Sequence, residues 1–169
     1  MVAKKASDNK KFWLLIVALL VVVLGGVLFV GAVSGWFSGP EMAMIDQEYY
    51  CDAKCVLELK DIDIDEYEKM ISEKKTFVVF VDQGGCDAAD RLREYADRYS
   101  NGERFTIFRV MFSDVKGSSL GEKVKYYPSM AIISKGKVLA WLRADSNDDA
   151  PAYNNYEDFE NWMRKHLKR

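Results

Sequence analysis

The chain has 169 residues, of which 49% are hydrophobic and 13% aromatic, so it can form a hydrophobic core and is not a disordered protein by composition. Its formal net charge of -2 hides an uneven distribution, because residues 1–40 hold four lysines and one aspartate (net +3) and the remainder is acidic (net -5). An acidic domain without clustered Lys and Arg is a poor candidate for binding nucleic acid, because phosphate binding needs such a cluster.

A hydrophobic stretch from Phe12 to Val33 contains no charged residue. About 20 apolar residues suffice for a helix to cross the hydrocarbon core of a bilayer, and such a helix satisfies its own backbone polar groups. All four lysines precede the stretch, so the positive-inside rule places the N-terminus in the cytoplasm. The sequence predicts a cytoplasmic segment at residues 1–11, a transmembrane anchor at 12–33, a linker at 34–50 and an extracytoplasmic domain at 51–169.

A cleaved signal peptide is the alternative to an anchor, because Val30-Gly31-Ala32 has the small residues that a signal peptidase accepts. The apolar run is longer than the usual signal-peptide core of roughly 7–15 residues, which favours the anchor. Either interpretation exports the domain, across a bacterial plasma membrane (the favoured one) or an ER membrane. The expected partners are the lipid bilayer, through residues 12–33, and exported protein or peptide clients.

The domain begins with alternating strand and helix patterns. Asp63, with Glu66 three residues later, has the form of a capping box at a helix start. Phe77 to Val81 is a continuous apolar run, which is typical of a strand buried on both faces. After a turn at residues 82–86, apolar side chains recur at helical spacing until Asn101-Gly102.

The second half of the domain predicts a hairpin followed by a helix, with a turn at residues 134–137. The full order is β-α-β-α-β and then β-β-α, with polar loops around residues 111–125 and 144–155. Such an order implies parallel strands with helical crossovers, followed by an antiparallel pair. The expected strands are residues 56–59, 77–81, 105–110, 130–133 and 138–142, and the last helix starts near residue 156.

This order, with a cysteine at the turn after the central strand, resembles the thioredoxin superfamily. Residues 77–92 are similar to the family's central strand, active-site turn and following helix. Residues 126–138 are similar to its segment of cis-proline, strand, Lys-x-Gly turn and strand. The resemblance covers about residues 56–169 and implies an α/β fold in which a mixed central sheet is flanked by helices.

The family's active site has two cysteines, spaced C-x-x-C, at the start of that helix. In this sequence the first position is Cys86, the second is Ala89, and Gly85 replaces the tryptophan that usually precedes the first. Phe80 stands where the family has a buried acid. The resemblance therefore keeps the nucleophile and loses the resolving thiol and the proton-handling acid. A helix N-terminus favours the thiolate of Cys86, and the neighbouring Asp87 opposes it.

The resemblance also assigns the substrate-facing loop. It implies that the Tyr127–Pro128 peptide bond is cis, which is inexpensive only before proline. It further implies that the backbone of Tyr127 pairs with an extended client peptide, as an added strand does. Tyr126 and Tyr127 either offer aromatic contact area to a client or belong to the core.

Cys51 and Cys55 have three interpretations. An oxidising compartment favours a local disulfide between them, which needs an irregular segment, because helical Cβ atoms four residues apart are roughly 5–6 Å apart, farther than a disulfide allows. Alternatively, one of them resolves Cys86. Metal binding has the least support, because the sole histidine, His166, lies on the distant last helix. We expect no metal and no other cofactor.

The acidic stretch 144–155 partly matches a calcium loop. Asp145, Asn147 and Asp149 stand at the first three ligand positions. Ala150 then replaces the required glycine and Tyr156 the bidentate glutamate. A solvated acidic loop is therefore the preferred interpretation.

Two functions follow from these patterns. The first is thiol–disulfide exchange outside the membrane, with Cys86 as the catalytic residue and Tyr127 and Pro128 as the substrate-binding residues. A lone thiol suits isomerisation or capture better than rapid net oxidation or reduction. The alternative is a non-catalytic domain that binds peptides or proteins at the membrane surface. The single histidine argues against a His-dependent enzyme.

Overall fold

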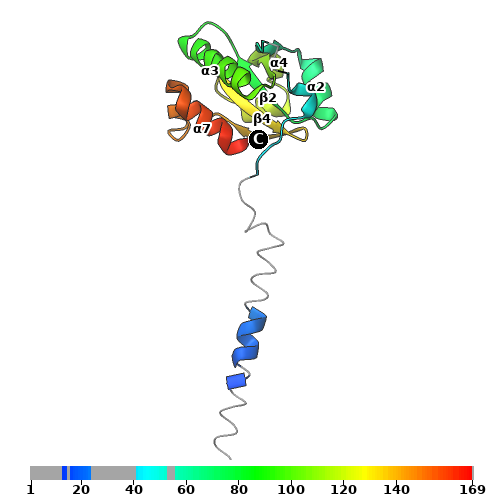
Figure 1. Cartoon of the computed structure of the whole chain (residues 1–169), viewed down its shortest axis with the longest axis vertical. Coiled ribbons are helices and arrows are strands. Elements are labelled where there is room, and N and C mark those ends of the chain that lie inside the picture. The colour runs from blue at the N-terminus through cyan, green and yellow to red at the C-terminus, as the bar shows by residue number, and fades with distance from the viewer. Residues whose placement is uncertain (1–12, 15, 24–40, 53–55, 169) are drawn as a thin grey trace, which may run out of the picture. The chain divides into compact units, whose positions relative to one another are not determined.

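The computed structural model describes residues 13–14, 16–23, 41–52 and 56–168. The chain divides into two compact units, Met1–Pro40 and Glu41–Arg169. In the first unit the described residues are helical, and they are drawn in blue in Figure 1. None of the helices in these described ranges is long and apolar enough to cross a membrane. The predicted anchor at 12–33 falls partly outside the described residues and stays a prediction.

The described part of the second unit is built on a five-stranded sheet in the order β1-β3-β2-β4-β5. β1, β3 and β2 are parallel, whereas β4 runs antiparallel to both β2 and β5. This arrangement confirms the predicted mixed sheet and its C-terminal hairpin. The strands are β1 (Lys60–Asp61), β2 (Phe77–Asp82), β3 (Ile107–Met111), β4 (Ser129–Ser134) and β5 (Lys137–Trp141).

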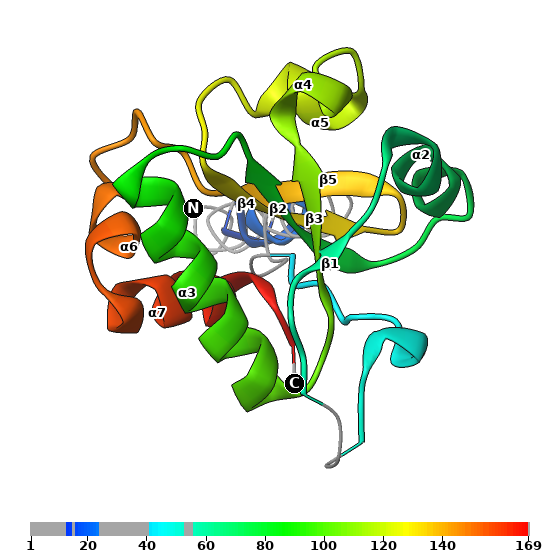
Figure 2. The ribbon, with the colours of Figure 1, turned by 90° about the horizontal axis from the view of Figure 1, so that it is seen from above.

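Helices cover both faces of the sheet, which lies between them in Figure 2. A short 3-10 helix, η1 (Gln47–Tyr49), precedes β1. One face packs against α3 (Asp87–Glu103), α6 (Ala150–Asn154) and α7 (Tyr156–His166). The other face packs against α2 (Ile64–Ser72), α4 (Phe112–Val115) and α5 (Ser119–Lys123).

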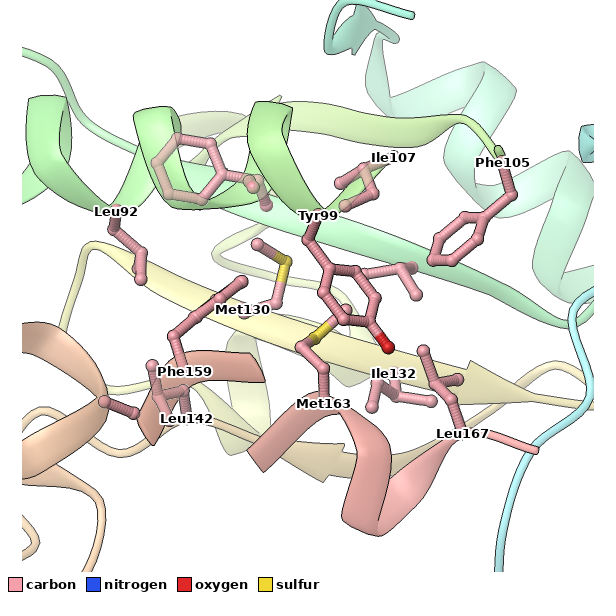
Figure 3. Packing of buried hydrophobic residues seen from close by; sticks show 14 of the residues in the cluster. Leu92, Tyr99, Phe105, Ile107, Met130, Ile132, Leu142, Phe159, Met163 and Leu167 are labelled. Atoms are coloured by element: carbon pink, nitrogen blue, oxygen red, sulfur yellow. The ribbon is translucent and has the colours of Figure 1, made fainter. Parts of the chain in front are cut away.

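Alternate residues of β2, β3 and β4 supply the two cores, because successive strand side chains point to opposite faces. Phe80 and Met130 lie in the core beneath α3 and α7, which Figure 3 shows around Leu92, Phe159 and Met163. Phe77 belongs to the core on the opposite face. Every residue of β2 is buried, which explains its continuous apolar run.

Two predicted helix starts are confirmed. The carboxylate of Asp63 accepts a hydrogen bond from the Glu66 backbone N–H at 2.8 Å, so it caps α2. Cys86 is the N-cap residue of α3. α3 continues past the expected stop at Asn101-Gly102 and ends at Glu103, where Arg104 adopts the left-handed conformation (φ 65°).

The predicted strand at residues 56–59 is wrong, because the first strand begins at Lys60. Side chains of α3 hold this segment instead of a neighbouring strand. The amide of Asn101 accepts from the Leu57 N–H (3.1 Å) and donates to the Leu57 carbonyl (2.6 Å). Asp97 accepts from the Leu59 N–H at 3.3 Å. The alternating pattern therefore marks a half-buried segment without a strand ladder.

The folded unit begins earlier than the expected boundary at residue 51, since residues 41–50 belong to it. Ala43 and Ile45 are buried. The Ala43 backbone donates to the carbonyl of His166 (2.8 Å) and accepts from the N–H of Lys168 (2.7 Å). The predicted linker thus overlaps a segment that pairs with the C-terminal end of the domain.

The predicted polar loops at 111–125 and 144–155 contain the short helices α4, α5 and α6. Each has only four or five residues, too few to show a helical period in the sequence. α6 carries a proline in its first turn, where a missing N–H costs no helical hydrogen bond.

Candidate active site

Cys86 lies where β2 leads into α3. Its backbone is extended (φ -139°, ψ 147°), and its side chain makes no capping hydrogen bond. The thiol is free and exposed, while the Cys86 carbonyl accepts from the N–H groups of Ala89 (2.9 Å) and Asp90 (3.2 Å). The thiol is therefore accessible to a client at the N-terminus of a long helix.

Two glycines shape the turn before Cys86. Gly84 and Gly85 have φ values of 74° and 77°, a region that residues with a Cβ rarely adopt. An added Cβ at either position would meet no atom within 4 Å. The turn therefore requires glycine for backbone conformation and not for space. This explains why Gly85, and no bulky aromatic residue, precedes the cysteine.

The loop before β4 reaches the same end of the sheet. Val81 of β2 pairs with Ser129 of β4 in the antiparallel ladder, so Pro128 lies at the end of the sheet where β2 leads to Cys86. The Tyr127–Pro128 peptide bond is cis, which confirms the prediction. Tyr126 and Tyr127 are 56% and 37% exposed, so the structure places both on the surface and not in the core.

Two more apolar side chains, the exposed Met111 and the half-buried Phe112, lie at the end of β3 and just after it. The Phe112 and Tyr127 rings have centroids 4.4 Å apart. Met111, which is 39% exposed, pairs with Asp82 at the last position of the β2–β3 ladder. We call Met111, Phe112, Tyr126 and Tyr127 the aromatic patch. Contiguous exposed apolar surface is a feature of interaction sites.

Tyr153 of α6 supports the loop that ends at Pro128, which we call the proline loop. Its hydroxyl lies 3.0 Å from the carbonyl oxygens of both Pro128 and Leu142, to which it donates. Burial raises the pKa of Tyr153, so the hydroxyl remains a neutral donor. The Ser129 hydroxyl also donates to the Leu142 carbonyl, at 2.7 Å. Sequence reasoning missed Tyr153 because it lies in the expected acidic loop.

Asp82 is a buried carboxylate at the end of β2, 2% exposed. It accepts hydrogen bonds from the Arg93 guanidinium and from the Gly84 N–H, both at 2.8 Å. Burial by itself raises the pKa of Asp82, but these hydrogen bonds and the charges of Arg93 and Arg109 outweigh it and hold the pKa below its usual value. Asp82 is thus ionised at neutral pH and fixes the turn that precedes Cys86.

Two arginines near Asp82 each contact a second carboxylate as well. Arg93 also bonds Asp90 at 2.8 Å. Arg109 donates to Asp61 at 2.7 Å and lies 3.8 Å from Asp82. We call these five residues the Asp82 network. The sequence carried one signal of it, an aspartate directly after an apolar strand, but the arginine partners are far along the chain.

The position of the family's buried acid is occupied by Phe80, which is fully buried in the core beneath α3. Ala89, at the position of the family's second cysteine, is 1% exposed. Neither side chain carries a titratable group. The structure therefore brings Cys86 and Pro128 to one end of the sheet without a second thiol at residue 89.

Cys51 is disulfide-bonded, whereas Cys86 is free. In this state Cys51 carries no free thiol, and the interpretation in which Cys51 or Cys55 resolves Cys86 stays a prediction. Cys55 lies outside the described residues, so its pairing with Cys51 stays a prediction. Within the described ranges, no group of three or more His, Cys, Asp or Glu side chains is arranged to hold a metal ion.

The remaining candidates have structural partners. The Asp149 carboxylate accepts from the backbone and the guanidinium of Arg143 (3.0 and 2.8 Å), which favours the acidic-loop interpretation over the calcium loop. His166 lies beside Trp162, with ring centroids 5.0 Å apart. Burial lowers the pKa of His166.

No protein-family model and no curated protein matches the chain. Among solved structures, a mutant thioredoxin from Halobacterium salinarum NRC-1 matches with a TM-score of 0.50 and 7% identity, over 66% of this chain and 93% of that one. Oxidised thioredoxin from Plasmodium falciparum matches with a TM-score of 0.49 and 14% identity, over 64% and 97%. Identities this low show the fold alone. The Halobacterium match and the strand order together indicate a thioredoxin fold, as the resemblance implied.

Proposed function

We propose that this thioredoxin-fold protein exchanges disulfides with exported client proteins through Cys86, while a transmembrane helix tethers it to the membrane. The observation that carries the proposal is the free, exposed thiol at the N-cap of α3. It lies at the same end of the sheet as the cis peptide before Pro128 and the exposed Tyr127.

The chemistry is two successive exchanges. The Cys86 thiolate attacks one sulfur of a client disulfide, the client S–S bond breaks, and the other client sulfur leaves as a thiolate that takes a proton from water. A second client thiol, or glutathione, then attacks the mixed disulfide and releases Cys86. When the client supplies both the disulfide and the attacking thiol, it ends with as many disulfides and thiols as before, so no electrons are gained or lost overall. Because Ala89 offers no second thiol, this isomerisation is the favoured reaction.

The loop at Tyr127 would hold the client during both steps. An extended client segment pairs with the Tyr127 backbone as an added strand, and the aromatic patch covers its apolar side chains. Tyr153 supports this role, because its hydroxyl binds the Pro128 carbonyl and fixes the loop before a client arrives. A loop held in its bound conformation loses less entropy on binding.

The membrane tether rests on the sequence. The length of the apolar stretch 12–33 supports an anchor, and the lysines before it support a domain on the outer side of the membrane. Disulfides persist in such compartments, and the disulfide-bonded state of Cys51 agrees with an oxidising location. We propose Cys55 as the partner of Cys51 and restrict the clients to exported proteins near the membrane surface.

A disulfide-isomerisation assay tests the proposal. The full chain in detergent is added to a small secreted protein with scrambled disulfides in a glutathione buffer, and recovery of native activity is followed. We expect the wild-type chain to accelerate recovery, and Cys86→Ser to leave it at the uncatalysed rate. Tyr95→Phe, which removes an exposed hydroxyl of α3, is the control and should behave as wild type. Equal rates for wild type and Cys86→Ser would remove the enzymatic proposal.

A non-catalytic binding domain is the second candidate. The absence of a titratable group at Phe80 and of a thiol at Ala89 favours it, as does the exposure of the aromatic patch. It predicts that Cys86→Ser binds clients as tightly as wild type, whereas Tyr127→Ala weakens binding. A loss of client capture in Cys86→Ser alone would argue against this candidate.

A further inference from the structure

A small pocket of about 140 Å³ opens beside the loop that ends at Pro128. One wall comes from the end of α5 and the residues after it, and the other from the end of β5 and the loop that follows. We call it the lysine pocket. Its lining residues are Lys123, Lys125, Tyr126, Trp141, Leu142, Arg143, Ala144 and Asp145.

Two positive charges in this pocket lack a carboxylate partner. Among the residues that the structure describes, Lys123 and Lys125 take part in no ion pair within 4.0 Å. The Lys123 ammonium lies 5.6 Å from the centre of the Trp141 ring, and that of Lys125 donates to the Gly121 carbonyl at 3.3 Å. Both side chains belong to exposed residues, so a ligand can reach them.

The other charges of the pocket contribute less. Arg143 is bonded to the buried Asp149, with 2.8 Å between Nε and Oδ2, so its charge is compensated. Asp145 is exposed on the rim and partly opposes the two lysines. The pocket still stands out, because residues 41–169 as a whole carry a net charge of -5. An unpaired cationic site on an acidic domain attracts an anionic group.

The pocket adjoins the loop that ends at Pro128, because two of its lining residues belong to that loop. Lys125 and Tyr126 directly precede Tyr127 in the chain. The opposite wall is held to β4, because the Leu142 N–H donates to the Met130 carbonyl at 2.8 Å. An extended peptide advances about 3.3 Å per residue. We expect a client side chain a few residues from the reactive cysteine to reach the pocket.

We propose that the lysine pocket binds the carboxylate side chain of an Asp or Glu in the client, so that acidic segments near a client cysteine are preferred. The inference rests on the proposed function, because it names the substrate class of the same site. The rings of Tyr126 and Trp141 cover the aliphatic part of the client side chain while the two ammonium groups face its carboxylate. Exposed charge pairs change affinity modestly, and we expect about threefold to fivefold for each lysine.

Peptide binding tests the inference without thiol chemistry. Three fluorescent peptides carry serine in place of the client cysteine and differ only in a neighbouring Glu, Gln or Lys. Their affinities for the full chain in neutral detergent are measured by fluorescence anisotropy at low and high salt. We expect the Glu peptide to bind most tightly and the Lys peptide most weakly, with the difference reduced at high salt.

Three variants locate the effect in the pocket. Lys125→Gln should reduce the preference for Glu over Gln about threefold to fivefold, and Asp145→Asn, which removes the opposing charge, should increase the preference. Lys137→Gln, an exposed lysine at the opposite end of β5, should leave it unchanged. Equal affinities for the three peptides, no measurable binding of the Glu peptide, or an unchanged preference in Lys125→Gln would overturn the inference. A failure of Cys86 chemistry alone would leave the peptide preference intact, so the two proposals fail separately.

Discussion

The end of the sheet that carries Cys86 has two halves that are built differently. At the ends of β2 and β3, every charged group of the Asp82 network has an opposite charge within 4.0 Å, and the carboxylate of Asp82 is buried. At the ends of β4 and β5, the tyrosines of the aromatic patch are exposed, and Lys123 and Lys125 have no carboxylate partner within the described part of the chain. The first half fixes the turn before Cys86, and we propose that the second half binds the client.

Removing Arg93 is expected to have the largest effect on stability. Arg93→Met leaves the buried carboxylate of Asp82 with the Gly84 N–H and, as its remaining cation, the more distant Arg109. Breaking a buried ion pair by removing one partner is costly, and we expect a loss of about 2–3 kcal/mol in the free energy of unfolding. Urea denaturation of the full chain in detergent, followed by circular dichroism, measures it.

The control for that variant is an exposed ion pair. Lys60 and Glu66 are 2.9 Å apart, with side chains 54% and 42% exposed. Lys60→Met should cost less than about 1 kcal/mol, because surface ion pairs are solvated in both states. If Arg93→Met cost no more than Lys60→Met, the two halves of the sheet end would not differ as described.

The pH dependence of stability gives a second comparison. The pKa of Asp82 is lower in the folded chain than in the unfolded one, so its contribution is fully present above the unfolded pKa and is lost as the pH falls through the folded pKa. We expect wild-type stability to fall from about pH 5 downward, and Asp82→Asn to flatten that fall. Thermal unfolding across the acid range measures the slope.

Asp97 is a control whose contribution to stability should change with pH in the opposite direction to that of Asp82. Burial raises the pKa of Asp97, so its contribution to stability decreases as the pH rises through the unfolded and then the folded pKa. Asp97→Asn should therefore make the acid-side loss steeper. Equal slopes in wild type, Asp82→Asn and Asp97→Asn would show that neither carboxylate is coupled to folding.

The smallest effect on the free energy of unfolding is expected at the ends of β4 and β5, where Tyr153 supports the proline loop. Tyr153→Phe removes the hydroxyl that binds the carbonyls of Pro128 and Leu142, and we expect a loss of about 1 kcal/mol in unfolding free energy. Client binding should weaken as well, because the proline loop is no longer fixed. Tyr95→Phe, whose hydroxyl makes an exposed bond of 3.2 Å to the Asn154 carbonyl, should be neutral. A neutral Tyr153→Phe would indicate that the loop holds its conformation without this contact.

Long, regular patterns predicted most of the fold. The apolar run of β2, the helical spacing of α3 and the Asp63 cap depend on neighbours in sequence, and all three were found. The strand predicted at residues 56–59 was wrong, because the backbone of an alternating segment can be hydrogen-bonded by side chains such as Asn101 as well as by a neighbouring strand. Sequence spacing alone does not reveal which partner takes the backbone hydrogen bonds.

For the candidate site, the sequence predicted the backbone positions of Cys86 and Pro128 but not the side-chain contacts around them. The cysteine at a helix start and the cis peptide before Pro128 follow from the resemblance. The pairing of Asp82 with Arg93, the support of Pro128 by Tyr153 and the exposure of Tyr126 depend on contacts between distant segments. Such contacts leave no periodic signal in a single sequence.

Covalent trapping tests the central claim, that Cys86 is the reacting thiol, most directly. The full chain and its Cys86→Ser variant are incubated with a peptide disulfide, remaining thiols are alkylated, and the intact mass and the modified residue are determined. We predict one peptide adduct on each wild-type chain, located at Cys86, and none on the variant. A wild-type chain that forms no adduct, or an adduct equally abundant in Cys86→Ser, would contradict the account.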